Sequence, residues 1–204
     1  RNVMKTAEVL RTLLNKESGE GSWDAEIKRA NILKLLEPLL DTMVIGDTTI
    51  SDNQDDIMLL LKDLLSDADP MVRKGAADVL ARLATLLQGR QGICKAGCVD
   101  ALARLLEDPD SSEVRLSAGR AILVLTQSVD GREAVAGEEA DQLVVGKVVQ
   151  ALLHVAERAS PIATPELVEP LLGTLANLLQ TDGGIALALG DGLMPFLVHA
   201  LRRR

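Results

Sequence analysis

The chain has 204 residues, of which 47% are apolar, with one Trp, one Phe and no Tyr. That apolar fraction is typical of a folded chain, and the shortage of aromatic side chains argues against base-stacking platforms, methyl-lysine cages and sugar-stacking clefts. Thirty acidic against 22 basic residues give a formal net charge of −8, which argues against generic nucleic-acid binding. The apolar residues are mostly Leu and Ala, so we expect an all-α fold.

Residues 1–54 carry apolar side chains at helical spacing but lack the motifs found further along the chain. We expect an N-terminal helical segment that is either a degenerate repeat or a cap over the first core layer. Its acidic end, Ser51–Asp56, resembles a calcium loop only faintly, because it lacks the central Gly and the Glu at the twelfth position. We therefore interpret it as a helix N-terminus whose carboxylates are stabilised by the macrodipole.

The next segment predicts two helices separated by a break at Ser66–Pro70. The first has apolar residues at i, i+3, i+4, i+7 and i+8, beginning at Ile57. In the break, Asp69 is a plausible N-cap and Pro70 suits a first helical turn. We expect the second, longer helix to run to Leu87 and to stop at a glycine. Seven glycines are interpreted as such helix stops at the repeat joints: Gly89, Gly97, Gly131, Gly183, Gly184, Gly190 and Gly192.

This pattern repeats along the chain. A shift of 42 residues carries Val72-Arg73 onto Val114-Arg115, and Gly89-Arg90 onto Gly131-Arg132. A third copy at an offset of 95 places Leu80-Ala81-Arg82-Leu83 on Leu175–Leu178. Because one such unit cannot bury its apolar stripe alone, stacked units must share a continuous core, which predicts a right-handed α-solenoid. The expected units are residues 55–97, 98–139, 140–192 and, as the start of a further repeat, 193–204.

The third copy is 11 residues longer than two periods require, so we expect an insertion between about Gly137 and Pro165. A proline-bounded loop of this kind projects from one face and is a second candidate for partner contact, although a tolerated loop would look the same. Its candidate residues are Glu138, Glu139, Asp141, Ser160 and Thr164.

Two motifs resemble armadillo repeats. Asp69–Ala84 is similar to the start of that family's long third helix, with the pattern V-R-x-x-A-x-x-x-L-x-x-L. Arg90–Gly97 is similar to its R-x-x-I-x-x-A-G element. The resemblance covers about residues 55–204, and within it Val72-Arg73, Gly89-Arg90 and the Leu-Leu-Glu-Asp-Pro run ending at Pro109 also resemble the armadillo-type radial spoke component of cilia.

The armadillo resemblance implies protein binding along a concave surface lined by the third helices, without catalysis. On that surface we expect Arg82, Arg120 and Asn177 to contact a partner, since Arg can bind carboxylates in a fork. Nuclear import adaptors of the family use a ladder of Trp and Asn there. The Trp positions fall on Asp78, Arg120 and Gly173, so recognition of a nuclear localisation peptide is not expected.

Other reactive side chains have structural interpretations. We expect Arg73 and Arg115 to pair within the solenoid with residues of the Asp67 or Glu107 type. Cys94 and Cys98 are interpreted as buried small apolar residues rather than as a metal pair. The two histidines, His154 and His199, lie in apolar helical contexts and have no matching nucleophile, so we predict no catalytic, cofactor or metal site.

The sequence therefore predicts a non-catalytic scaffold that binds other proteins, and no nucleic acid, membrane insertion or small-molecule substrate. No apolar run reaches 18 residues and no signal peptide follows Arg1, so we expect a cytoplasmic fragment of a longer protein. A ciliary or axonemal assembly is one setting. The alternative is a cytosolic chaperone cofactor or GTPase-exchange adaptor that clasps a folded client.

Overall fold

The computed structural model describes residues 54–136, 143–157, 165–190 and 192–202, and these ranges contain helices and turns but no strand. The predicted N-terminal segment, apart from its last residue, lies outside the described residues, as does the first half of the acidic run, residues 51–53. The helices are α3 (Gln54–Leu64), α4 (Pro70–Leu83), α5 (Leu87–Lys95), α6 (Cys98–Leu105), α7 (Ser112–Thr126), α8 (Val129–Ala136), α9 (Leu143–Glu157), η3 (Pro165–Leu167), α10 (Val168–Leu178), α11 (Asp182–Gly190) and α12 (Leu193–Arg202).

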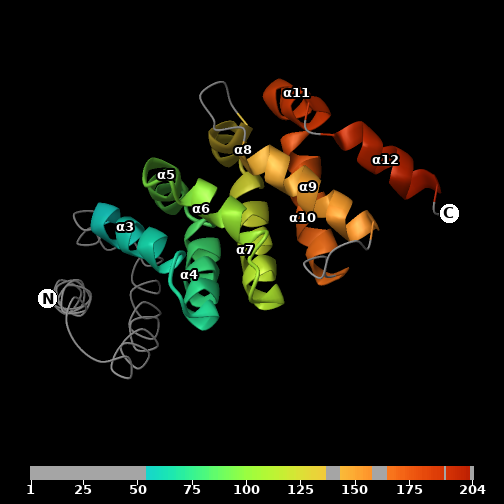
Figure 1. Ribbon diagram of the computed structural model, residues 1–204. Helices are drawn as coiled ribbons and strands as arrows, with labels where there is room; N and C mark the ends of the chain where they lie inside the picture. The colour runs from blue at the N-terminus through green and yellow to red at the C-terminus, as the bar shows by residue number, and fades with distance from the viewer. Residues whose placement is uncertain (1–53, 137–142, 158–164, 191, 203–204) are drawn as a thin grey trace, which may run out of the picture.

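The helices are arranged in three rows that run along one elongated array (Figure 1). The helices α4, α7 and α10 lie side by side, and we call them the third helices. The helices α3, α6, α9 and α12 form a second row, in which each packs on the next. The short helices α5, α8 and α11 follow one edge. The bounds of the individual repeats stay a prediction.

The start of α4 is set by the residues that the sequence indicated. Asp69 has an extended backbone and its side chain accepts a hydrogen bond from the Met71 amide at 2.8 Å, while Pro70 is the first helical residue. This is a side-chain cap that satisfies one of the unpaired amides of the first turn. In the next unit Ser111 caps α7 by accepting from the Val114 amide.

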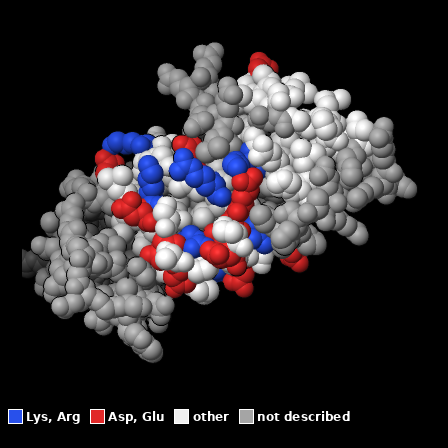
Figure 2. Space-filling model, in the orientation of Figure 1, with Lys and Arg blue, Asp and Glu red and all other residues white. Residues whose placement is uncertain are grey.

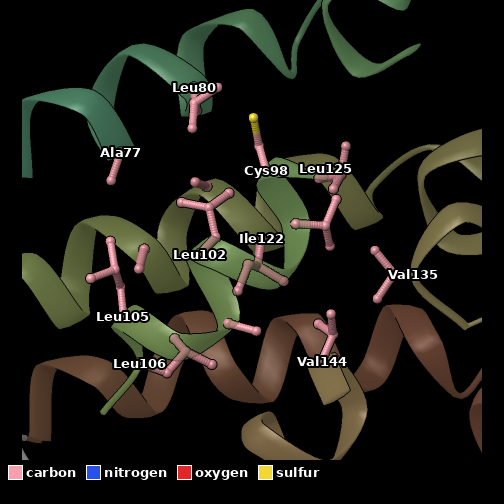
Figure 3. Close-up of a cluster of buried hydrophobic side chains, with 14 of the residues drawn as sticks. Ala77, Leu80, Cys98, Leu102, Leu105, Leu106, Ile122, Leu125, Val135 and Val144 are labelled. Atoms are coloured by element: carbon pink, nitrogen blue, oxygen red, sulfur yellow. The ribbon is translucent and has the colours of Figure 1, made fainter. Parts of the chain in front are cut away.

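One apolar core runs through the described units. All five residues of the predicted stripe are buried, four of them in α3 and Leu65 directly after it: Ile57, Leu60, Leu61, Leu64 and Leu65. In Figure 3 side chains from α4, α6, α7, α8 and α9 meet in one cluster, with Leu80, Leu102 and Ile122 at 1% exposure or less. Because no single unit encloses this cluster, the units stabilise one another.

The glycine prediction is wrong for most of the seven positions. The second helix ends at Leu83, and Gly89 lies inside α5. A Cβ on Gly89 would lie 2.0 Å from the Leu83 carbonyl oxygen, and one on Gly131 would lie 1.9 Å from that of Leu125. These glycines are therefore needed because a short helix crosses the end of a third helix at close range. Among the seven glycines, all of which the structure describes, Gly97 and Gly192 alone have positive φ, 69° and 99°, as is common where a helix stops.

Part of the extra length in the third unit is helical. Helix α9 has 15 residues, whereas α6, its counterpart in the row, has 8. The residues proposed as an insertion loop, 137–142 and 158–164, lie outside the described residues.

Ion pairs connect neighbouring units. Lys95 contacts Asp55 at 2.6 Å, Arg90 contacts Asp130 at 2.9 Å, and Lys147 contacts Glu107; each pair is separated by 40 residues. With the expected unit bounds, the Arg90 and Lys147 pairs each join one unit to the next, whereas Lys95 and Asp55 join the end of the first unit to its start. The Arg90 partnership also lowers the pKa of the Asp130 carboxyl, because the guanidinium donates a hydrogen bond to it.

Candidate partner-binding surface

The surface of the third helices holds the three residues predicted to contact a partner. Arg82 lies at the end of α4 and Arg120 in the middle of α7, and both are exposed. Asn177 lies near the end of α10 and is half-buried. Because α4 packs on α7 and α7 on α10, the three residues belong to one continuous layer of helices. Their role in binding stays a prediction.

Asn177 is oriented by the neighbouring helix. Its Nδ2 donates to the Thr126 hydroxyl oxygen at 3.3 Å, and that hydroxyl in turn donates to the Ile122 carbonyl oxygen at 3.0 Å. The amide of Asn177 is thus held in one position, with hydrogen-bonding capacity beyond this single contact. Arg120, by contrast, makes no ion pair with any described residue and extends from α7 toward solvent.

Next to these residues the layer is closely packed. A Cβ on Gly173 would lie 2.8 Å from a methyl group of Leu123, so the Leu123 side chain occupies the space above α10. Lys74 and Asp78 form an i,i+4 ion pair at 2.9 Å on α4. The result is a surface with apolar patches between separated polar side chains.

Arg73 lies near the start of α4, and all of its donor nitrogens make hydrogen bonds within the protein. Its Nε and Nη2 donate to both carboxylate oxygens of Asp108 at 2.7 and 3.1 Å, and Nη2 also donates to Asp110. Its Nη1 donates to the carbonyl oxygens of Asp67 and Ala68. The hydrogen bonds to Asp108 raise the pKa of Arg73 against the opposing effect of its burial.

The predicted pairing within the solenoid is therefore confirmed for Arg73, although its acidic partners are Asp108 and Asp110. The helical periodicity of the sequence could not identify Asp108 as the partner of Arg73, because Asp108 lies in the loop between two helices. The sequence feature that could have indicated it is the Asp108-Pro109 pair shortly before the cap of the next helix. The cluster lines an open hollow of about 340 Å³, but the donors of Arg73 are already used within the protein, so we assign it a structural role.

Arg115, the counterpart of Arg73 one unit later, has no such partner. Its Nη1 donates to the Asp108 carbonyl oxygen at 2.6 Å, while its buried Nε has no hydrogen-bond partner. Burial lowers its pKa. The expected ion pair with a carboxylate is therefore wrong for this residue.

The two cysteines and His154 are buried or half-buried in the described helices. Cys98 is fully buried and its thiol donates to the Met58 carbonyl oxygen at 3.5 Å, and burial raises its pKa to about 11. Cys94 is half-buried, and burial also raises its pKa. His154 has a buried Nδ1 without a hydrogen-bond partner, and the side chain of His199 lies outside the described residues. No described group of His, Cys, Asp or Glu side chains could hold a metal ion.

The second candidate region is the insertion expected between about Gly137 and Pro165. Its residues all lie outside the described ranges: Glu138, Glu139, Asp141, Ser160 and Thr164. Among the helices that are described, none has the length and apolar character needed to cross a bilayer.

Comparison with known proteins supports the fold. A designed armadillo repeat protein solved with the peptide (KR)4 superposes with a TM-score of 0.65 at 19% identity, over 95% of this chain and 72% of that chain. Computationally designed armadillo repeat proteins for modular peptide recognition give 0.66 at 17%, over 95% and 73%. An engineered protein gives 0.64 at 25%, over 94% and 42%.

In sequence, residues 42–127 match the family model of the non-SMC mitotic condensation complex subunit 1, a HEAT-like repeat family. No curated protein matches the chain. The all-α, right-handed solenoid of armadillo/HEAT-like repeats that the sequence predicted is thereby confirmed.

Proposed function

We propose that the chain is a non-catalytic scaffold that binds a segment of another protein across its third helices. The observation that carries this proposal is the exposure of two arginines, Arg82 and Arg120, on the adjacent, packed helices α4 and α7. Repeat solenoids present extended surfaces of this kind, and a fixed backbone lowers the entropic cost of holding an extended segment.

The chemistry of the surface favours carboxylates. Guanidinium groups bind carboxylates in a fork, and the half-buried amide of Asn177 suits a backbone peptide group. One of the similar designed proteins was solved with a peptide of Lys and Arg. At Arg82 and Arg120 such a peptide would meet like charge, so we infer a segment with acidic residues at those two points. The overall charge of −8 attracts basic regions elsewhere on the partner, which gives a partner of mixed charge.

Two cellular settings follow from the sequence. In the first, the chain is a cytoplasmic subunit of a ciliary or axonemal assembly of the cytoskeleton, such as a radial spoke. In the second, it is a chaperone cofactor or exchange-type adaptor that clasps a folded client. Both use protein partners, and neither requires a cofactor or a catalytic residue.

A binding titration tests the surface directly. A fluorescent extended peptide with alternating Glu and Leu is titrated against the chain and against the Arg82→Glu/Arg120→Glu variant, with (KR)4 as the probe of opposite charge. We expect the acidic peptide to bind the natural chain and to lose at least about tenfold in affinity in the variant. Arg104, exposed on α6, provides the matched control, and Arg104→Glu should bind as the natural chain does.

Affinity capture from ciliated cells then separates the two settings. Axonemal proteins that are lost with the double variant would support the ciliary scaffold, while chaperones or a small GTPase would support the adaptor. If neither peptide affinity nor the set of captured proteins changes in the double variant, the third helices are not the binding surface and the proposal fails.

A further inference from the structure

A polar side-chain contact joins the third helices α7 and α10, where Nδ2 of Asn177 donates to Oγ1 of Thr126 at 3.3 Å. We infer that Thr126 is a positioning residue, which turns the side-chain oxygen of Asn177 outward so that this oxygen accepts a hydrogen bond from a backbone N–H of the bound segment. This role requires a segment that crosses the third helices, so it rests on the proposed function and specifies the partner group that Asn177 recognises.

The hydroxyl of Thr126 determines which end of the amide faces it. Thr126 is 0% exposed, so water cannot complete its hydrogen bonds. Its single proton is used within α7, where Oγ1 lies 3.0 Å from the carbonyl oxygens of Ile122 and Leu123. The hydroxyl oxygen is therefore left as an acceptor, and the NH2 group of Asn177 is its matching donor. If the amide were reversed, the hydroxyl would have to leave its own helix to donate to Oδ1, and one of the two hydrogen bonds would be lost.

The other end of the Asn177 amide is open. Asn177 is half-buried, and its Oδ1 accepts no hydrogen bond from any residue that the structure describes. The buried side-chain atoms that lack a partner in the described part of the chain belong to Arg115, His154 and Thr174, and Oδ1 of Asn177 is not among them. This oxygen is therefore accessible from outside, and a bound segment can reach it.

The surroundings of this oxygen favour a neutral donor. Residues 121–129 and 173–181 contain no charged side chain, and one turn before Asn177 a methyl group of Leu123 covers Gly173. The visible face in Figure 2 shows the same trend, because its charged side chains gather toward the first two units and few lie over the third. An apolar floor strengthens a hydrogen bond between neutral groups but leaves a cationic donor without a counter-charge. A backbone N–H is a neutral donor that nearly every residue of an extended segment provides.

Stacking of the third helices does not itself require this polar pair. Shifts of 42 and 53 residues carry Ala84 onto Thr126 and Val124 onto Asn177, so the equivalent positions one unit earlier are apolar. Ala84 belongs to the core and Val124 packs against it. A buried hydrogen bond gives only a small net gain in stability. The exchange of an apolar pair for Thr126 and Asn177 therefore favours a role in recognition.

A binding cycle with modified peptides tests this inference. In the alternating Glu and Leu peptide, one backbone N–H at a time is replaced by an ester oxygen, which removes a single donor and adds no bulk. We expect at least one ester peptide to bind the natural chain about fivefold more weakly than the unmodified peptide. In Thr126→Val, which keeps the shape of the side chain, the same ester should change the affinity by less than about twofold, and Thr126→Ser should restore the sensitivity.

Thr174 provides the matched control. It is a fully buried threonine on α10 whose hydroxyl has no hydrogen-bond partner, so Thr174→Val should respond to the ester as the natural chain does. A readout without any partner is the side-chain amide signal of Asn177 in nuclear magnetic resonance spectra. That signal should move toward the position of a solvent-exposed amide in Thr126→Val and stay in place in Thr126→Ser and Thr174→Val.

Several results would overturn the inference. They are an amide signal that Thr126→Val leaves unchanged, equal affinities for all ester peptides, and an ester effect that persists in Thr126→Val or disappears equally in Thr174→Val. In each of these cases the proposed function survives if the Arg82→Glu/Arg120→Glu variant still loses the unmodified peptide. If the ester effect depends on Thr126 but the arginine variant binds normally, the positioning role stands and the arginine surface fails. A natural chain that binds none of the peptides overturns both.

Discussion

Arg73 and Asp108 join two successive units through a buried bidentate ion pair, with Nε 2.7 Å from Oδ2 and Nη2 3.1 Å from Oδ1. Asp108 also accepts hydrogen bonds from the backbone amides of Asp110 and Ser111 through Oδ1. One carboxylate therefore fixes both the stacking of α4 against the following unit and the loop that leads into α7. The pair acts as an inter-unit clamp rather than as a ligand site.

Removing one member of this pair should be costly. We expect Arg73→Met to lower the free energy of unfolding by about 3–5 kcal/mol, because the Asp108 carboxylate stays buried without its ion-pair partner. Asp108→Asn should cost less, because Arg73 keeps its ion pair with Asp110. Urea unfolding followed by circular dichroism measures this. Lys74→Ala removes an exposed ion pair on the same helix and should cost only about 0.5 kcal/mol. Equal losses at the two sites would contradict the assigned burial.

Arg115 provides a contrasting case at the equivalent position. Its Nε is buried without a partner and burial lowers its pKa, so its charge is poorly compensated. We expect Arg115→Met to change stability by less than about 1 kcal/mol, and in either direction, since it removes an unsatisfied donor together with one good hydrogen bond. The comparison with Arg73→Met under the same conditions is the measurement. A loss as large as that of Arg73→Met would show that Arg115 has a compensating partner.

The glycines at the start of the short helices should tolerate no side chain. Gly131→Ala places a Cβ 1.9 Å from the Leu125 carbonyl oxygen, and backbone on both sides must move. We expect a loss of about 2–3 kcal/mol in thermal or urea unfolding. Gly190 has no atom within 4 Å of the added Cβ, so Gly190→Ala should be neutral or stabilise the chain by up to about 1 kcal/mol. Equal behaviour of the two variants would contradict the close crossing.

Cys98 should make stability depend on alkaline pH. Its folded-state pKa is raised to about 11 from 9.0, because burial disfavours the thiolate. The buried, protonated thiol therefore makes its full contribution to the free energy of unfolding below the pKa of the unfolded state. That free energy should fall by roughly 2–3 kcal/mol as the pH rises from about 9 to 11. The free energy of unfolding of the natural chain and of Cys98→Ala, measured between pH 8 and pH 11, should converge by about that amount. Parallel curves would exclude Cys98 as the cause.

Thiol labelling provides an independent check of the same burial. In the native state at neutral pH, Cys98 should react with a thiol reagent only through unfolding, since it is inaccessible and un-ionised. Cys94, which is half-buried, should react sooner. Mass spectrometry of the labelled peptides distinguishes the two. Faster labelling of Cys98 would contradict its position in the core.

The sequence predicts the features that depend on local spacing. The apolar stripe of α3, the cap at Asp69 and the repetition of Val-Arg are each visible in a few neighbouring residues, and each is confirmed. The pairing of Arg73 was expected for the same reason. The identity of its partner, Asp108, was not, because the two residues are 35 positions apart and meet only after the units stack.

The wrong prediction for most of the glycines has a related cause. A glycine that stops a helix and one that lets two helices cross closely look the same in a sequence. The difference between Gly97 and Gly89 is the sign of φ at the first and the proximity of the Leu83 carbonyl group at the second. Similarly, the sequence shows that the third unit has 11 extra residues, but only the structure shows that some of them lengthen α9. The partner-binding roles of Arg82, Arg120 and Asn177 stay predictions that the proposed titration addresses.

The Arg90–Asp130 and Lys147–Glu107 ion pairs connect successive units, and the apolar core stabilises the structure both within and between the units. Added salt weakens the partly exposed pairs but leaves the buried Arg73–Asp108 clamp and the core largely untouched. We therefore expect added salt to loosen the contacts between units more than the packing inside each unit. A partner that spans several units would then meet a more deformable surface in concentrated salt than in dilute salt.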